Sequence, residues 1–308
     1  MGRRNKKGRN ITGIIVIDKP KGRTSNHVLQ QIKRTFDAKK AGHTGSLDPL
    51  ATGVLPICLG EATKVSQYLL DGDKCYQVTC KLGVTTDSGD SDGNVVAEMP
   101  IPEITEQILY AVLPSFIGKQ QQVPPMYSAL KFQGQPLYKL ARQGIEIERK
   151  ARTVNIYDII LISFTSDSFT LEVKCSKGTY IRTLVEDISA SLSTGGHVIA
   201  LRRLESAGYA IEQAITIESI EECADEGINA LDKLLLPTEE ALPNWPRIEA
   251  DDEQVLALRC GQQIQVEQKY EGVQIRLFDR LGIFLGLGEM SQKGIISPKR
   301  VFVVDESS

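Results

Sequence analysis

The chain has 308 residues, of which 41% are hydrophobic and 24% are charged, and its formal net charge is −3. These values are ordinary for a globular protein, and the length is sufficient for a large core and two domains. No apolar run approaches the roughly 20 residues of a membrane helix, and no signal-type stretch follows the basic start MGRRNKKGRN, so we expect a cytoplasmic protein.

Charge is strongly segregated along the chain. Residues 1–50 carry twelve Lys and Arg against three acids, and residues 119–152 carry seven against two. Residues 205–255 have the opposite balance, with two basic residues and fourteen acids. This pattern favours a basic face that binds a polyanion, and the alternative is a set of solvated surfaces that cluster in sequence.

The first part of the chain alternates strand and helix patterns. Residues 13–22 are an apolar run that ends in Lys-Pro and Gly, which predicts a buried strand entering a turn. Residues 24–36 open with capping residues and continue at helical spacing. After a loop rich in Gly and Pro come a short strand (VLPICLG), a helix over 61–70 and a strand over 75–84 whose side chains alternate.

The later part predicts a helix over 104–116, an exposed insertion over 119–152, strands over 153–164 and 169–178, a helix over 179–192 and a strand over 197–211. The acidic stretch that follows ends in PNWP, where we expect a domain boundary. From Arg247 short apolar runs alternate with turn signals, which predicts a small all-β module.

Neither the cysteines nor the histidines predict a metal site. The six cysteines include no C-x-x-C pair, and His27 and His197 have no Cys or acid at ligand spacing. The loop TTDSGDSDGN superficially resembles a calcium loop, in a register that begins at Ser88, but the twelfth position of that register is Met99, where a Glu is required. We therefore assign no metal.

One acidic residue stands out in the glycine-rich stretch GHTGSLDPLATGVLPICLG, residues 42–60. Asp48 is its single formal charge, and it lies among leucines and valines. Burying a lone carboxylate is costly unless a partner compensates it. Taken alone, an Asp before a Pro is more often a turn former than a catalytic group.

Four stretches occur in an order that changes this interpretation: KPKGRTS (19–25), AGHTGSLDPLATGVL (41–55), KCYQVTCKLG (74–83) and SKGTYIRTLVEDI (176–188). Together they resemble the TruB family of tRNA pseudouridine-55 synthases over about residues 11–211. The resemblance implies an α+β fold with a central mixed, mainly antiparallel sheet flanked by helices. It also implies a catalytic domain, 1–246, with an RNA-clamping insertion at about 119–152, and an all-β PUA-like RNA-binding domain, 247–308.

The same resemblance implies an activity. The enzyme would convert uridine 55 in the T-loop of tRNA to pseudouridine by cutting the glycosidic bond at N1, turning the base and rejoining it through C5. It would act as a monomer on the T-arm, without guide RNA, metal or organic cofactor. Because the target lies in a folded loop, the base must be flipped out, which costs on the order of a few kcal/mol.

Three residues are implied to carry the chemistry. Asp48 would be the nucleophile, attacking either C6 of the base or C1′ of the ribose. Arg182 would hold that carboxylate ionised, and its alternative is an ordinary phosphate or surface contact. Tyr76 would stack on the uracil and accept the C5 proton, and its alternative is a core tyrosine.

Five further positions match substrate-binding positions of the family. Tyr180 and Leu201 match the substrate pocket, although taken alone both would be core residues. His43 would contact the RNA and help to hold the nucleotide flipped out. Lys19 matches a position near the pocket where a structural role is expected, and Lys131 matches one that helps to hold the insertion.

Two alternatives stay open from the sequence. One is an RNA-binding or RNA-folding helper in which the chemistry is dispensable. The other is a guide-dependent catalytic subunit of related fold, which we disfavour because those proteins lack an insertion like residues 119–152.

Overall fold

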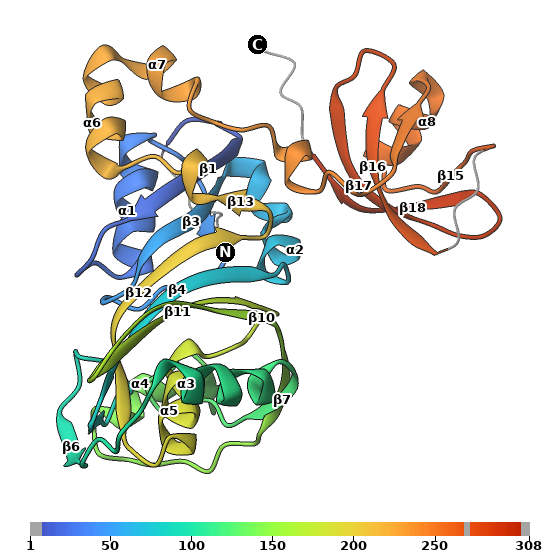
Figure 1. The fold of residues 1–308 in the computed structure, drawn as a ribbon. Helices are drawn as coiled ribbons and strands as arrows, with labels where there is room; N and C mark the ends of the chain where they lie inside the picture. Colours follow the sequence, from blue (N-terminus) through green and yellow to red (C-terminus); the bar gives the residue numbers. More distant parts are fainter. Residues whose placement is uncertain (1–7, 268–271, 303–308) are drawn as a thin grey trace.

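The computed structural model describes residues 8–267 and 272–302, which form two main sheets, one of nine strands and one of five (Figure 1). Four of the basic residues that we expect to face RNA, Arg3, Arg4, Lys6 and Lys7, lie outside the described residues. In the described parts of the chain, no helix has the length and apolar character that crossing a membrane requires.

The larger sheet has the order β1-β3-β12-β4-β11-β10-β7, with β2 beside β3 and β13 beside β12. Its ladders are antiparallel except for one short parallel pair, in which Arg202 and Arg203 of β12 lie beside Thr52 and Gly53 of β3. This arrangement confirms the predicted mixed, mainly antiparallel sheet. The strands are β1 (Gly13–Lys19), β2 (Ala41–His43), β3 (Thr52–Leu59), β4 (Lys74–Leu82), β7 (Gly118–Gln122), β10 (Arg152–Thr165), β11 (Ser168–Cys175), β12 (Gly196–Ser206) and β13 (Tyr209–Ala210).

One end of this sheet is covered by α1 (Ser25–Thr35), α6 (Ile217–Glu226) and α7 (Ile228–Asp232) (Figure 1). Helix α1 begins where the sequence predicts, because the Thr24 hydroxyl accepts a hydrogen bond from the His27 amide. The apolar face of α1 is buried against β1 and β3. The segment that follows α1 therefore lies close to the sheet and enters β2, which pairs with β3.

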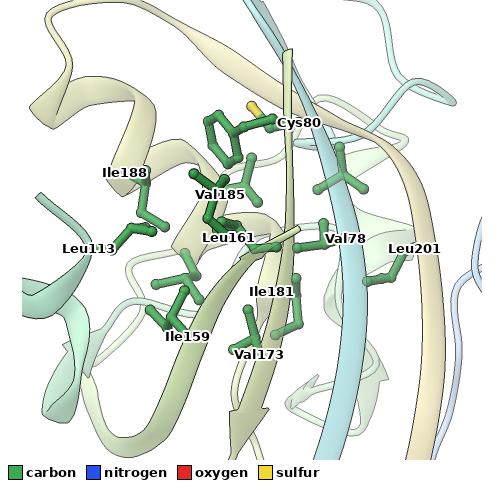
Figure 2. Close-up of a cluster of buried hydrophobic side chains, with 14 of the residues drawn as sticks. Val78, Cys80, Leu113, Ile159, Leu161, Val173, Ile181, Val185, Ile188 and Leu201 are labelled. Carbon is green, nitrogen blue, oxygen red and sulfur yellow. The ribbon is translucent and has the colours of Figure 1, made fainter. Parts of the chain in front are cut away.

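The other half of the sheet is covered by α5 (Ile181–Ser191) and by α3 (Glu106–Val112) with the turn η2 (Leu113–Phe116). Figure 2 shows Val185 and Ile188 of α5 in one buried cluster with Val78 and Val173 of the sheet, and Ile188 lies beside Leu113. Val185 and Ile188 are fully buried, as their helical spacing predicts. This packing fixes the position of α5 and therefore of Arg182, which lies in its first turn.

Two predicted elements differ in detail. The helix predicted over 61–70 is split into η1 (Gly60–Lys64) and α2 (Ser66–Leu70), because the Thr63 and Ser66 hydroxyls bond to nearby backbone carbonyls. The stretch 119–152 begins with β7, which pairs with β10 in the central sheet, so its first residues are not an exposed appendage. Its remainder holds β8 (Lys131–Phe132), β9 (Gln135–Pro136) and α4 (Leu137–Ala141).

The polar loop at 85–94 is the turn of a hairpin between β5 (Val84–Thr86) and β6 (Val95–Glu98). Short turns η3 (Ile211–Gln213) and η4 (Thr238–Ala241) flank α6 and α7 in the acidic stretch. The hairpin directs its loop back toward the centre of the large sheet, where Asp90 bridges to Val198 of β12.

The smaller sheet has the order β14-β16-β17-β18-β15 and follows the acidic stretch. It also carries a helix that the sequence analysis does not predict, α8 (Asp252–Arg259), whose start is marked by reciprocal capping between Asp251 and Gln254. Leu287 and Phe302 pack against residues of the larger sheet. The strands are β14 (Arg247–Ala250), β15 (Ile264–Gln265), β16 (Val273–Asp279), β17 (Phe284–Met290) and β18 (Ile295–Val301).

The packing of α5 generates a stability prediction. Ile188→Ala leaves a cavity in a fully buried cluster, so the free energy of unfolding should fall by about 2–5 kcal/mol in urea titrations. The matched control is Ile160→Ala on β10, where 47% of the residue is exposed and the loss should be below about 1 kcal/mol. Equal losses in the two variants would contradict the proposed role of α5 packing.

Candidate active site

A pocket of about 290 Å³ opens where the loop before β3, the strands β4 and β12 and the start of α5 meet. The structure brings five of the eight predicted site residues into its lining. These are Asp48, Tyr76, Tyr180, Arg182 and Leu201.

The loop that carries Asp48 is held in place by its own backbone and by α1. Gly45 and Gly53 adopt φ values of +134° and +98°, which favour glycine at both positions. The Ser25 hydroxyl accepts from the Leu47 amide at 2.7 Å and donates to the Leu47 carbonyl at 3.1 Å. Asp48 is therefore presented from a fixed loop and not from a mobile one.

Arg182 is the partner that the lone carboxylate needs. Its side chain is only 6% exposed, and its Nη2 lies 3.1 Å from Oδ2 of Asp48. Its remaining bonds fix the guanidinium: Nη2 donates to the Tyr127 carbonyl and Nη1 to the Ser88 carbonyl, both at 2.6 Å. Nη1 also lies 3.4 Å from Oδ2 of Asp90, so one arginine joins two carboxylates.

Asp90 is a functional candidate that the sequence analysis missed. Its side chain is 6% exposed, and its Oδ1 accepts from the Ser88 hydroxyl at 2.7 Å and from the Asp92 amide at 3.1 Å. The loop that we rejected as a calcium site therefore supplies a second carboxylate for Arg182. The high density of polar residues in this turn could have marked it as a candidate site. Nothing in the turn itself indicates that it contacts an arginine 92 residues away.

The pKa of Asp48 reflects competing influences. Burial raises the pKa of this carboxyl above its ordinary value, and the charge of Asp90 adds to the rise. The nearby charges of Arg182 and, more weakly, Lys19 oppose this rise, and the pKa stays above its ordinary value. Since 41% of the Asp48 side chain is still accessible through the pocket, the carboxylate can meet a ligand.

Aromatic and aliphatic side chains complete the lining. Tyr76 and Leu201 come from the adjacent strands β4 and β12. Tyr180 is held at the start of α5 by the Gln122 amide, which donates to its carbonyl at 3.1 Å and accepts from its N–H at 3.0 Å. The Arg152 guanidinium lies 4.7 Å from the centre of the Tyr180 ring. A flat ring entering this pocket would meet aromatic and aliphatic surfaces close to Asp48.

Three predicted residues lie outside the lining of this pocket. Lys19 is fully buried beneath the loop, where its Nζ donates to the carbonyls of Pro20 and Arg23, at 2.9 and 2.6 Å, and burial lowers its pKa to about 8. His43 is in β2, and its Nδ1 is buried without a hydrogen-bond partner. Lys131 is exposed in β8.

The lining also includes two arginines that the sequence analysis did not single out as pocket residues. Arg152 was grouped with the charges of the insertion, yet it covers Tyr180. Arg203 is 1% exposed and follows Leu201 by two positions on β12. The available signal was an arginine two positions after Leu201 on a strand, which places both side chains on the same face.

Comparison with known proteins decides the family. The N-terminal domain model of the TruB family of pseudouridylate synthases matches residues 33–181. Two further models, both for C-terminal TruB domains, match residues 182–243 and 246–302. The chain belongs to the TruB family. It is therefore a pseudouridine synthase, as the ordered motifs around Asp48, Tyr76 and Arg182 predict.

TruB relatives match along almost the whole chain. A protein of Saccharophagus degradans named tRNA pseudouridine synthase B is 49% identical over 309 residues, which cover 98% of this chain and 99% of the relative. A protein of Shewanella amazonensis with the same name is 48% identical over 314 residues, with 99% of both chains covered.

Solved structures of related proteins confirm the α+β fold of this TruB chain. A chain from a Cbf5-Nop10-Gar1 complex superposes with a TM-score of 0.73 at 26% identity, covering 94% of this chain and 85% of that one. A chain from an H/ACA RNP bound to a substrate RNA containing 2′-deoxyuridine also gives 0.73, at 24% identity, and covers 99% of this chain and 92% of that one.

One more charge on α5 influences the electrostatics of this TruB site. Glu186 lies one turn beyond Arg182, and burial raises its pKa from 4.5 to about 7, while the charge of Arg182 counters the rise. Between these two pH values the folded protein binds more protons at Glu186 than the unfolded chain does. Stability from this group is therefore lost as the pH rises from about 4.5 to 7.

Glu186→Gln should remove that loss. We expect the variant to match the parent at pH 4.5 and to exceed it in free energy of unfolding by roughly 2 kcal/mol at pH 8, after allowance for partial solvent exposure. Urea titrations at both pH values measure the difference. The exposed Glu218→Gln on α6 is the control, and a Glu186→Gln effect that is the same at both pH values would refute the assignment.

Proposed function

We propose that this enzyme converts uridine to pseudouridine at position 55 in the T-loop of tRNA, flips the target base into the pocket and uses Asp48 as nucleophile. The observation that carries the proposal is the Asp48–Arg182 ion pair at 3.1 Å beside Tyr76, Tyr180 and Leu201. The name tRNA pseudouridine synthase B of the nearly full-length relatives supports tRNA as the substrate.

Arg182 counters the effect of burial on a nucleophilic carboxylate. Desolvation favours the protonated acid, which does not attack carbon, whereas the fixed guanidinium favours the ionised form. Arg182 also orients the attacking oxygen, because its other bonds to Tyr127, Ser88 and Asp90 prevent it from following the carboxylate. Asp48 then forms a covalent bond to C1′ of the ribose, which displaces N1 of the uracil, or to C6 of the base. That bond to Asp48 breaks again once C5 has joined C1′, so the exchange of bonds is divided into easier steps.

Tyr76 would stack on the flipped uracil, a contact worth roughly 1–3 kcal/mol per base. Together with Tyr180 and Leu201, this contact offsets the cost of unstacking the base from its loop. In the last step the phenolate of Tyr76 would remove the proton from C5, whose electron pair enters the ring while N1 takes a proton from water.

The remaining parts would bind RNA. The basic residues of 119–152 would hold the T-arm, with Lys131 helping to hold that segment and His43 supporting the flipped nucleotide. In this proposal the chain divides at 246/247 into a catalytic and a PUA-like domain and works as a cytoplasmic monomer. Stand-alone action without guide RNA is supported by the higher identity to tRNA pseudouridine synthases B than to Cbf5.

Asp48→Asn tests the chemistry because it removes the nucleophile with little change in shape. On a T-arm hairpin with no other RNA, the parent protein should form pseudouridine at the target position, as read by chemical mapping. The variant should lose at least about 10³-fold in rate, the scale seen when a nucleophile is removed. Its affinity for the hairpin should stay within about threefold of the parent, because a carboxylate is not a group that neutralises phosphates.

Two results would contradict the proposal. A normal rate in Asp48→Asn would remove the role of Asp48 as nucleophile. Modification by the parent protein that appears only after a second RNA is added would instead favour the guide-dependent alternative.

The insertion generates a separate prediction. Replacing Lys139, Arg142 and Lys150 by Gln should weaken hairpin binding and reduce the slope of log Kd against log salt by about one for each lost phosphate contact. The control replaces Lys233, an exposed lysine of the acidic stretch 205–255, by Gln, and its slope should equal that of the parent. An unchanged slope in the insertion variant would show that those charges do not face RNA.

A further inference from the structure

Arg203 has the largest fully buried side chain among the residues that the structure describes, and it is 1% exposed. Within residues 8–267 and 272–302 it forms no ion pair with an acidic side chain. Buried cations are normally paired, because an uncompensated charge in the interior is costly. The neighbouring Arg202 shows the ordinary arrangement, since its Nη2 lies 2.6 Å from Oδ2 of Asp18. The burial of Arg203 without an acidic partner therefore needs a different explanation.

The hydrogen bonds of Arg203 reach both ends of the loop that carries Asp48. Its Nε donates to the Val54 carbonyl at 2.7 Å, and its Nη2 donates to the Gly45 carbonyl at 3.3 Å. Its backbone lies so close to the loop that a Cβ at Gly53 would come within 2.2 Å of the Arg203 carbonyl oxygen. One guanidinium thus holds the entry and the exit of the loop at a fixed separation.

The same side chain lies beside the aromatic wall of the pocket. Arg203 and Tyr76 are direct partners in the β12–β4 ladder, and both line the pocket. Burial raises the pKa of the Tyr76 phenol, and the charge of Arg203 is the largest influence that counters the rise. A cation without a carboxylate partner is therefore available to a phenolate at Tyr76.

We propose that Arg203 is a positioning residue for pseudouridine formation, which fixes the Asp48 loop against Tyr76 and stabilises the phenolate form of Tyr76. This inference rests on the proposed function of Tyr76 as acceptor of the C5 proton. In that step the phenolate oxygen takes the proton, the C5–H electron pair restores conjugation in the ring, N1 takes a proton from water, and the phenol later returns its proton to solvent.

The first test does not depend on activity. In protein labelled with ¹³C at Cζ of tyrosine, the Tyr76 signal is identified by its loss in Tyr76→Phe and is titrated in the parent, Arg203→Met and Arg203→Lys. The titration midpoint of Tyr76 should rise by about one pH unit or more in Arg203→Met and by less in Arg203→Lys, which keeps the charge. Arg202→Met, on the same strand, should leave the midpoint unchanged.

The second test uses single-turnover rates on the T-arm hairpin from pH 6 to 10. Arg203→Met should lower the rate by about 10–100-fold with hairpin affinity within about threefold, and the rising alkaline limb should move to higher pH. In the Tyr76→Phe background, Arg203→Met should lower the rate by a smaller factor, because the phenol that Arg203 acts on is already absent.

An unchanged titration of Tyr76 in Arg203→Met, or an equal shift in Arg202→Met, would overturn the inference whatever the activity. If urea titrations show that Arg203→Met does not fold, Arg203→Lys is used in its place. An unchanged titration midpoint of Tyr76 together with an unchanged pH profile in Arg203→Lys would then overturn the proposal. Failure of the parent protein to modify the hairpin would overturn the proposed function and with it the catalytic part of this inference, while the NMR result would still report the electrostatic pairing.

Discussion

The ion pair between Asp48 and Arg182 is the interaction on which the rest of the site depends. Burial of the Asp48 carboxylate is costly, and the arginine that pairs with it is itself almost fully buried. Arg182 can occupy that place because α5 is packed on the sheet through Val185 and Ile188. The hydrophobic core and the catalytic chemistry therefore depend on the same helix.

The second constraint is the short parallel contact between β3 and β12. It joins the half of the sheet that carries the Asp48 loop to the half that carries Tyr76, and Arg203 lies at this junction. Because β12 also presents Leu201 to the pocket, its position determines the aliphatic wall, the aromatic wall and the loop together. The position of β12 therefore determines how three segments that are far apart in sequence lie relative to one another.

Periodicity predicted much of this fold. The alternation around Tyr76 and the helical spacing of Ile181, Val185 and Ile188 are local patterns, and each corresponds to an observed element. The meeting of Asp90 with Arg182 was not predictable, because a polar turn carries no information on which distant helix it will face. Helix α8 was missed because its apolar pattern is weak, although its capping residues were visible in the sequence.

The central claim is that Arg182 favours the ionised form of Asp48 at a site where burial opposes ionisation. The most direct measurement is a ¹³C NMR titration of protein labelled at Cγ of aspartate, with the Asp48 signal identified by its loss in Asp48→Asn. In Arg182→Met the pKa of Asp48 should rise by about one unit or more above that of the parent, because the desolvation of the carboxyl is then uncompensated. A pKa of Asp48 that is unchanged or lower in Arg182→Met would contradict this account.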